Sequence, residues 1–195
     1  MGKMWVYVDG ACFDNGKPWA RAGYGVWFGS NHPLNCSGTI PGRQTNQAAE
    51  ITAAIVALDI ATRKRASSLK IFTDSKYLFD GATLWIEKWQ NNNWITCSGE
   101  TVVSKDLWLE LEEAINRFGF GRISWRHVPK HCGNFGNMQA DRLAKEAASE
   151  ATDDESDSDD DYEDYSNGYS DDYDDYNDYN DYNDYNGYDG SDDWY

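Results

Sequence analysis

The chain has 195 residues and a formal net charge of −17, but the charge is unevenly divided. All 17 Lys and Arg residues and 15 of the 34 acids fall in residues 1–150, so residues 151–195 carry the other 19 acids and no basic residue. There is no apolar run near 18 residues, no secretory leader pattern and no Cys-x-x-Cys spacing. This composition argues against a membrane protein, a secreted protein and a zinc ribbon, and favours reduced thiols in the cytoplasm or nucleus.

Three strand patterns begin the chain. Residues 4–13 are rich in β-branched and aromatic residues, and residues 24–29 and 34–42 have similar patterns. The segments between them contain Asn-Gly, Pro and Gly, which are typical of turns. Because short turns join them, we expect these strands to pair antiparallel.

A long helix pattern follows over residues 44–64. Ala48, Ile51 and Leu58 fall on one face at helical spacing, together with Ile55. Either Thr45 or its neighbour Asn46 is a candidate N-cap. This segment is long enough to cross over the sheet and bring in a parallel strand.

Strand and helix patterns alternate in the remainder of residues 1–150. We expect a strand at 68–74, two short helices at 75–82 and 83–92 separated by Gly81, an amphipathic helix at 105–118 capped by Ser104, a strand at 122–128 and a helix at 136–150. This order predicts an α/β domain. Its sheet is five-stranded and mixed, with three antiparallel strands followed by two parallel strands, and helices flank it.

Four acids lie in four separate, well-defined sequence patterns, and three of them interrupt stretches that otherwise predict buried structure. Asp9 lies in the run MWVYVDG, Glu50 lies in the long helix, Asp74 ends the run LKIFTD, and Asp141 lies in the last helix. A buried carboxylate is costly unless it is paired or binds a cation. Because strand ends and the helices beside them share one edge of such a sheet, we expect the four to converge. Carboxylate oxygens favour hard divalent metals, so the pattern predicts a metal site.

Five segments of residues 4–149 resemble, in order, the motifs of type 1 ribonucleases H. They are YVDGACFDNG, PGRQTNQAAEI, FTDSKYLFDG, WIEKWQNNNW and HVPKHCGNFGNMQADRLAKEAA. The resemblance implies a ribonuclease H-like catalytic domain over residues 1–150. It also implies an endonuclease that hydrolyses the RNA strand of RNA–DNA hybrids and leaves 5′-phosphate and 3′-hydroxyl ends.

The resemblance further implies a catalytic and metal-binding quartet. Its members would be Asp9, Glu50, Asp74 and Asp141, which would hold two Mg²⁺ ions, with Mn²⁺ as a possible substitute. His131 matches the family histidine on the loop before the last helix, where it would assist proton transfer or product release. The alternative for His131 is an ordinary surface histidine.

Two groups of residues match substrate contacts of the family. Arg43 and Thr45 would bind a DNA-strand phosphate, while Asn46 and Gln47 would contact the minor groove of the hybrid. A helix N-terminus offers free N–H groups to a phosphate, although capping alone is the alternative. Asn15 would lie near the RNA strand, or it is part of a plain Asn-Gly turn.

Aromatic residues match the family's DNA channel. Tyr77, Trp85 and Trp89 would pack on deoxyribose, where a 2′-hydroxyl would be too crowded. The alternative for the two Trp residues, spaced i and i+4, is the core face of a helix. Thr96 matches a residue of a phosphate pocket.

Three positions depart from the family pattern. Lys88 is the only Lys in the segment WIEKWQNNNW, where relatives are usually Lys-rich, so hybrid affinity should be weaker or less dependent on salt. Ser104 stands where an Asn often completes the phosphate pocket. Met138 replaces an acid that usually lies near the active site.

Other functions remain as alternatives. A catalytically weak or silent hybrid-binding module would be favoured by the loss of one acid, but all four are present. A Holliday-junction resolvase or integrase would lack GRQTN and WIEKW. A ribonuclease H domain detached from a reverse transcriptase is disfavoured by the start at Met1. We expect a monomer that binds an RNA–DNA hybrid and no membrane.

Residues 151–195 repeat Asp, Tyr and Asn with almost no aliphatic residue, so we expect a disordered acidic tail. One hypothesis is a solvated tail that aids solubility. A second is a nucleic-acid mimic that contacts the substrate channel of its own chain. A third is contact with a basic protein partner.

Overall fold

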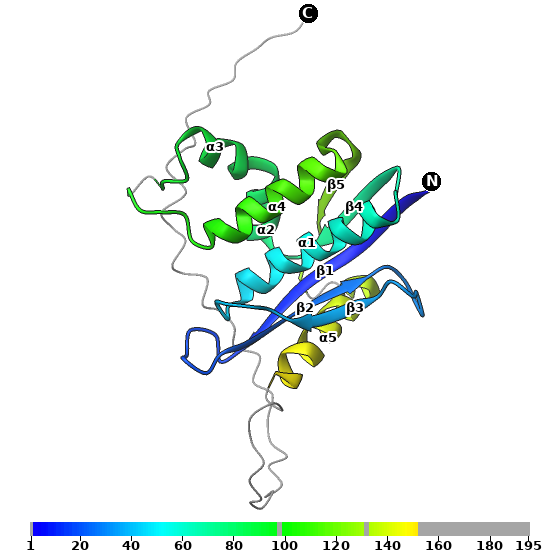
Figure 1. The fold of residues 1–195 in the computed structure, drawn as a ribbon. Coiled ribbons are helices and arrows are strands. Elements are labelled where there is room, and N and C mark those ends of the chain that lie inside the picture. Colours follow the sequence, from blue (N-terminus) through cyan, green and yellow to red (C-terminus); the bar gives the residue numbers. More distant parts are fainter. Residues whose placement is uncertain (1, 97–98, 131–132, 152–195) are drawn as a thin grey trace, which may run out of the picture. The chain divides into compact units, whose positions relative to one another are not determined.

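The computed structural model describes residues 2–96, 99–130 and 133–151. Five strands form one mixed sheet in the order β3-β2-β1-β4-β5 (Figure 1). β1, β2 and β3 pair antiparallel, whereas β4 and β5 add parallel strands on the other side of β1. The strands are β1 (Lys3–Phe13), β2 (Arg21–Trp27), β3 (Cys36–Thr39), β4 (Ser68–Thr73) and β5 (Ile123–His127). The predicted fold class is confirmed.

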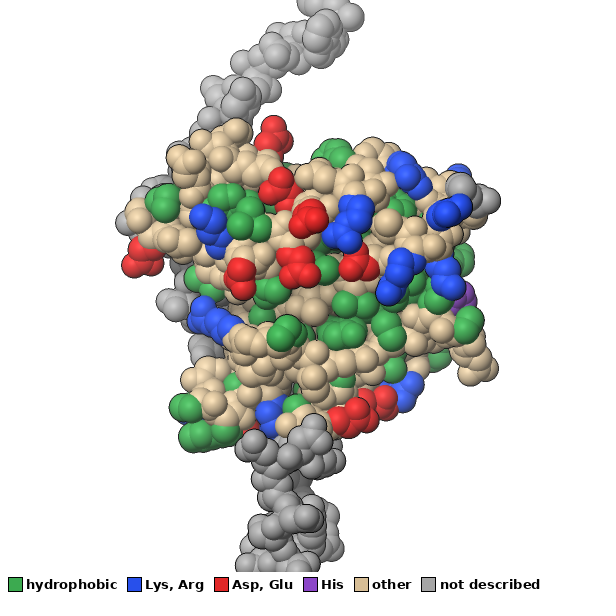
Figure 2. Space-filling model, viewed as in Figure 1, with side chains coloured by type: hydrophobic (Ala, Val, Ile, Leu, Met, Phe, Trp, Pro, Cys, Tyr) green, Lys and Arg blue, Asp and Glu red, His purple; other side chains and the backbone are tan. Residues whose placement is uncertain are grey.

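Helices cover both faces of this sheet. The main ones are α1 (Asn46–Arg63), α4 (Lys105–Phe118) and α5 (Phe135–Glu150), and the shorter ones are α2 (Lys76–Asp80), the π-helical turn η1 (Gly81–Trp85), α3 (Ile86–Asn91) and the 3₁₀ turn η2 (Phe120–Arg122). α1 packs on β1 and against α4, while α5 packs on β1, β2 and β3. Figure 1 places α1 and α4 on one side of the sheet and α5 on the other. Figure 2 shows the α1–α4 side, where Asp and Glu side chains gather across the middle.

Two glycines let α1 and α5 approach the central strands closely. A Cβ on Gly10 of β1 would lie 2.4 Å from the backbone nitrogen of Glu50 in α1. A Cβ on Gly25 of β2 would lie 2.1 Å from the carbonyl oxygen of Ala140 in α5. Neither distance is possible for a real side chain, so the glycines are required. As a result, the helix segments around Glu50 and Asp141 lie directly against the sheet.

The long helix begins as the sequence predicts. The Thr45 hydroxyl accepts a hydrogen bond from the backbone N–H of Ala48, which identifies Thr45, and not Asn46, as the N-cap. Ala48, Ile51 and Leu58, with Ile55, are buried, so the predicted apolar face is confirmed. The cap sets the position of the first helical turn and therefore the position of Glu50.

Gly81 does not separate two helices. The backbone stays helical from α2 through η1 to α3, with Gly81 opening the π-helical turn. A Cβ at this position would lie 2.1 Å from the Trp108 ring, so the residue is small because an aromatic ring packs on it. The predicted break was wrong because a close contact, and not a turn, requires the glycine.

Two further predictions need correction. Ser104 occupies the N-cap position of α4 as predicted, but its backbone is left-handed with φ of 55° and its side chain makes no capping hydrogen bond. The third strand is shorter than the predicted 34–42 and spans only Cys36–Thr39.

Among the described residues, no helix combines the length and apolar character needed to span a membrane.

Candidate active site

Four carboxylates from four elements interact around Asp9. Asp9 lies in β1, Glu50 in the first turns of α1, Asp74 directly after β4, and Asp141 in α5. Asp9 is only 6% exposed, and the backbone N–H of Gly10 donates to its Oδ1 at 2.8 Å. Burial raises its pKa well above the usual value, and the charges of Asp74, Glu50 and Asp141 raise it further. The structure therefore brings together the four acids that the sequence analysis selected.

Glu50 is held by two side chains that the fold places beside it. The Asn46 amide donates to Oε1 at 2.9 Å, and the Ser75 hydroxyl donates to Oε2. Burial raises the pKa of Glu50 to about 7, while the Ser75 hydrogen bond and the charge of Lys130 oppose this rise. Ser75 was absent from the sequence analysis, although its place next to Asp74 is a signal that could have identified it.

Asp74 contacts α5, and Asp141 is part of this helix. The Asn137 amide nitrogen donates to Oδ2 of Asp74 at 2.7 Å. Asp141 forms an ion pair with Lys145 at 3.2 Å, one turn later on the same helix. Sequence analysis missed Asn137, although its position four residues before Asp141 places both on one helix face.

The donor set fits a hard divalent cation. All four acids offer carboxylate oxygens, the ligand type that Mg²⁺ prefers. Asn137 Oδ1 is buried and has no hydrogen-bond partner among the described residues, so a polar acceptor is left over beside Asp74. In the described part of the chain, no three acidic, His or Cys side chains form a ready-made ion site. A divalent cation would offset the mutual repulsion of the four carboxylates.

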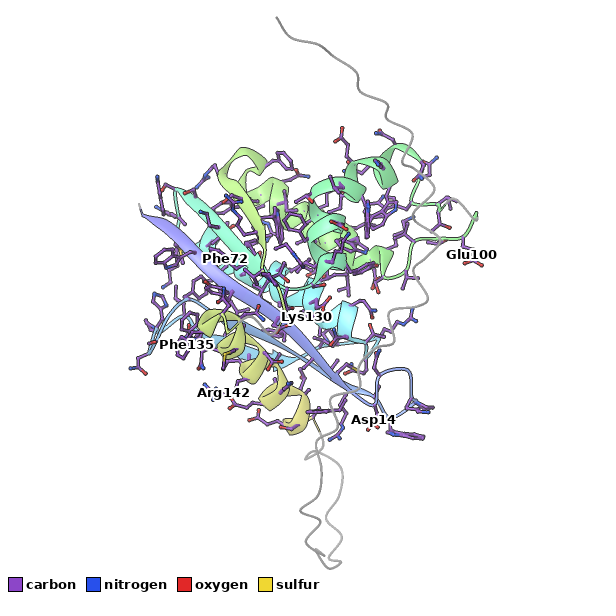
Figure 3. The ribbon with its side chains drawn as sticks, turned by 180° about the vertical axis from the view of Figure 1, so that it is seen from behind. Asp14, Phe72, Glu100, Lys130, Phe135 and Arg142 are labelled. Carbon is purple, nitrogen blue, oxygen red and sulfur yellow. The ribbon has the colours of Figure 1, made fainter. Side chains whose placement is uncertain are left out.

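The loop before α5 supplies a positive charge that acts on the carboxylates. His131 lies outside the described residues, so its expected role stays a prediction. Lys130 is exposed, and its charge lowers the pKa of Glu50, which places it within electrostatic reach of the carboxylates. Figure 3 labels Lys130 near the N-terminal half of α5. The sequence analysis had not selected Lys130.

The N-terminus of α1 gathers several of the expected substrate contacts. The backbone N–H of Asn46 donates to Oδ1 of Asn15 at 3.4 Å, so the first loop lies beside this helix end. Arg43 is exposed, while Thr45 and Gln47 are half-buried. Because Asn46 also binds Glu50, this surface is continuous with the carboxylates. The binding roles of these residues stay predictions.

The aromatic residues form a packed cluster next to this region. Trp89 is only 5% exposed and lies against Trp85 and Trp108, with ring centroids 5.6 and 5.3 Å apart, respectively. Its burial favours the interpretation as helix core. Tyr77 and Trp85 are half-buried, and the Trp108 indole donates to the Tyr77 hydroxyl at 3.2 Å. These two retain surface that a ligand could contact.

The remaining selected residues lie at the edges of the site. Thr96 sits in a tight turn, where its hydroxyl donates to the carbonyl oxygen of Glu100 at 3.1 Å. Met138 is 55% exposed in the first turn of α5, directly after Asn137. A role for Thr96 in phosphate binding stays a prediction.

Comparisons with known proteins identify the family of this chain. A family model described as RNase H matches residues 1–149. The chain is similar to Ribonuclease H1 of Rattus norvegicus, with 44% identity over 146 residues that cover 75% of this chain and 50% of the relative. It is also similar to Ribonuclease H of Ehrlichia canis, with 40% identity over 152 residues that cover 77% of this chain and 97% of the relative. The chain thus spans about half the length of the rodent relative.

Solved structures show the same fold. One is LC9-RNase H1, described as a type 1 RNase H with the type 2 active-site motif, with a TM-score of 0.62, 28% identity and coverage of 78% of this chain and 74% of that one. A second is the foamy viral protease-reverse transcriptase in complex with an RNA/DNA hybrid, with a TM-score of 0.63, 21% identity and coverage of 74% and 20%. At this identity the viral enzyme shows the fold alone.

Proposed function

This chain belongs to the ribonuclease H family, and on that premise we propose that it is an endonuclease that hydrolyses the RNA strand of RNA–DNA hybrids. The observation that carries the proposal is the cluster of four carboxylates around Asp9. Burial of Asp9 and the negative charges of the other three raise its pKa. A cluster that is unfavourable by itself but suited to divalent cations is what metal-assisted hydrolysis requires.

The four acids would hold two divalent cations. Bound there, Mg²⁺ ions would lower the pKa of the attacking water and neutralise charge on the scissile phosphate, giving 5′-phosphate and 3′-hydroxyl ends. The protein's own task is to hold the carboxylates in position. Asn46 and Ser75 orient Glu50, and Asn137 orients Asp74.

Hybrid binding is assigned to the surface beside these acids. Arg43 and the N-terminal turn of α1 offer positive charge and backbone N–H groups to a phosphate. Asn15 and Asn46 lie together there and present amide groups to the minor groove. The exposed parts of Tyr77 and Trp85 suit contact with deoxyribose, because a 2′-hydroxyl would be too crowded against the rings.

The direct test is cleavage of an end-labelled RNA–DNA hybrid in Mg²⁺, with double-stranded RNA and double-stranded DNA as controls. We expect cleavage of the hybrid's RNA strand alone, and Asp9→Asn should abolish it. Asp59→Asn is the matched control, since Asp59 is an acid on α1 that pairs with Arg117 and lies outside the cluster. Hybrid binding without cleavage in Mg²⁺ or Mn²⁺ would contradict the proposal and favour a binding module.

The nature of the products needs a second readout. RNA fragments from the reaction are treated with a phosphatase and a kinase before gel analysis. Fragments that can be labelled at the 5′ end only after phosphatase treatment carry a 5′-phosphate, as we expect. Cyclic 2′,3′-phosphate ends would instead mean that the RNA 2′-hydroxyl is the nucleophile, which would contradict the metal-assisted attack of water.

A further inference from the structure

Part of the sheet on the α5 side is not covered by a helix. α5 packs on β1, β2 and β3, and its first turn lies on Tyr7, where a Cβ on Gly136 would come within 2.4 Å of the Tyr7 ring. The stretch of β1, β4 and β5 beyond that turn has no such cover among the described residues. Figure 3, which looks at this side, labels Phe72 of β4 beyond the N-terminal end of α5.

Strand register defines the side chains on this surface. Side chains two apart on a strand share a face, so the rows follow from the parallel pairing of β4 with β1 and β5. One row holds Trp5, Lys70 and Ser124, and the next holds Tyr7, Phe72 and Arg126. We call this surface the open sheet face and define it by the residues Lys3, Trp5, Lys70, Phe72, Ser124 and Arg126.

The open sheet face combines exposed rings with unpaired cations. Trp5 is 69% exposed, and Phe72 is half-buried and stacks on Tyr7 with ring centroids 4.6 Å apart. Lys3, Lys70 and Arg126 are exposed and form no ion pair within the described part of the chain. The rows on this face contain no acid until the carboxylate site is reached.

The opposite side of the molecule has a different character. α4 carries four acids, Asp106, Glu110, Glu112 and Glu113, and Figure 2 shows Asp and Glu side chains across the middle of that side. An anionic polymer would be repelled from α4 and attracted to the open sheet face. Figure 2 also shows Lys and Arg side chains on that side, so the difference in charge lies between α4 and the open sheet face.

The open sheet face also leads directly to the carboxylates. Asp9 follows Trp5 and Tyr7 on the same face of β1, and Asp74 comes directly after β4, which carries Lys70 and Phe72. Strand residues rise about 3.3 Å each, so Lys70 lies about 13 Å along the strand from Asp74. A chain that leaves the carboxylate site along the strands would reach this surface within a short distance.

We propose that the open sheet face binds a single-stranded nucleic acid segment that extends from the hybrid held at the carboxylate site, an inference that rests on the proposed function. Rings on which bases stack, interleaved with cations for the phosphates, are the features of sequence-independent single-strand binding. A duplex keeps its bases stacked internally and would use the cations but not the rings. The exposed Trp5 ring is therefore the element that favours a single strand.

Fluorescence anisotropy with the full chain carrying Asp9→Asn tests this inference. The probes are a blunt hybrid, the same hybrid with a single-stranded RNA or DNA extension at either end, and a hybrid lengthened by the same number of base pairs. We expect an extension at one end to tighten binding at least roughly fivefold, the lower limit for stacking one base on an aromatic ring. The lengthened duplex should not reproduce this gain.

Two triple variants identify the surface responsible. Trp5→Thr with Lys70→Gln and Arg126→Gln should remove the gain. A matched control changes an exposed ring and two exposed cations elsewhere, namely Phe120→Thr with Lys64→Gln and Arg65→Gln, and should keep it. The readout is the ratio of the dissociation constants for the blunt hybrid and the extended hybrid, both measured on the same protein. A general loss of folded protein would affect both measurements and would not change this ratio.

Several outcomes would overturn the inference. They are no gain from any extension, an equal gain from the lengthened duplex, and a gain that survives in the Trp5, Lys70 and Arg126 variant. If the chain neither binds nor cleaves the blunt hybrid, the proposed function fails by itself. Free single-stranded RNA and DNA then decide, because the same variant should bind them more weakly than the control, and equal affinity would contradict the inference.

Discussion

The carboxylates Asp9 and Glu50 and the aromatic cluster formed by α2, η1, α3 and Trp108 of α4 both include buried side chains, but their energetics differ. In the first, burial and like charges raise the pKa values of Asp9 and Glu50, so the ionised site destabilises the fold. In the second, Trp89 and Trp108 pack at 5.3 Å and bury apolar surface. Two neighbouring groups of buried side chains therefore have opposite effects. The carboxylates suit the proposed chemistry but lower the stability of the fold, whereas the aromatic residues raise it.

The largest expected effect breaks function and leaves the fold intact. Asp9→Asn should reduce hybrid cleavage by a factor on the order of 10² or more, since it removes an electrostatic element of the site. The melting temperature in EDTA should stay equal or rise, because a buried charge is removed. Cleavage assays measure the loss of activity, and thermal unfolding measures the melting temperature. A large drop in melting temperature would show that Asp9 is structural and would weaken the comparison.

The opposite effect is expected at Trp89. Trp89→Ala should lower the free energy of unfolding by about 3–5 kcal/mol, because it leaves a cavity against Trp85 and Trp108. Trp85→Ala is the comparison, since Trp85 is half-buried and should cost less stability. Urea unfolding measures both. If Trp89→Ala lost cleavage while keeping its stability, Trp89 would belong with the substrate contacts.

The pH dependence of stability sharpens the comparison. The pKa of Glu50 is about 7 in the fold against its ordinary value of 4.5, so the unfolded state releases this proton more readily. The Glu50 contribution is therefore fully present below pH 4.5 and is lost as pH rises through about 7, by at most about 1.4 kcal/mol per pH unit. Urea unfolding in EDTA across this window measures the slope.

Glu50→Gln is the variant that tests the assignment. It should flatten the slope, while a change at the exposed Glu146 on α5, Glu146→Gln, should leave it unchanged. Asp9 remains in both variants and contributes in the same direction, so some slope should persist in Glu50→Gln. Stability that rises with pH in this window would contradict the pKa shifts.

The smallest expected effect concerns Ser104, at the entry to α4. Its φ of 55° is left-handed, a region that Asn tolerates better than other side chains. Ser104→Asn should raise the free energy of unfolding by roughly 0.5 kcal/mol, and Ser104→Thr should lower it, because a β-branched residue disfavours this backbone. Chemical unfolding of the two variants decides. If Asn also tightened hybrid binding, the missing phosphate contact would be located here.

Sequence patterns predicted the sheet and the four acids because each leaves a local signal. A run of β-branched and aromatic residues indicates a strand, and Asp9 stands out because it interrupts one. The segment around Gly81 could not be predicted, since its helical path depends on Trp108, which comes later in the chain. Asn137 was missed for a similar reason, because its function depends on Asp74 from another element.

The glycine-mediated approach of α5 to the central strands has a consequence for synthesis of the chain. Asp141 reaches the other acids only after α5 docks against β1 and β2, and α5 is the last element of the domain to be translated. A nascent chain that has exposed β1 through β5 therefore has three of the four carboxylates but an incomplete site. On the proposed function, docking of the last helix completes the set of four carboxylates, so a growing chain should not cleave nucleic acid before this helix has been made.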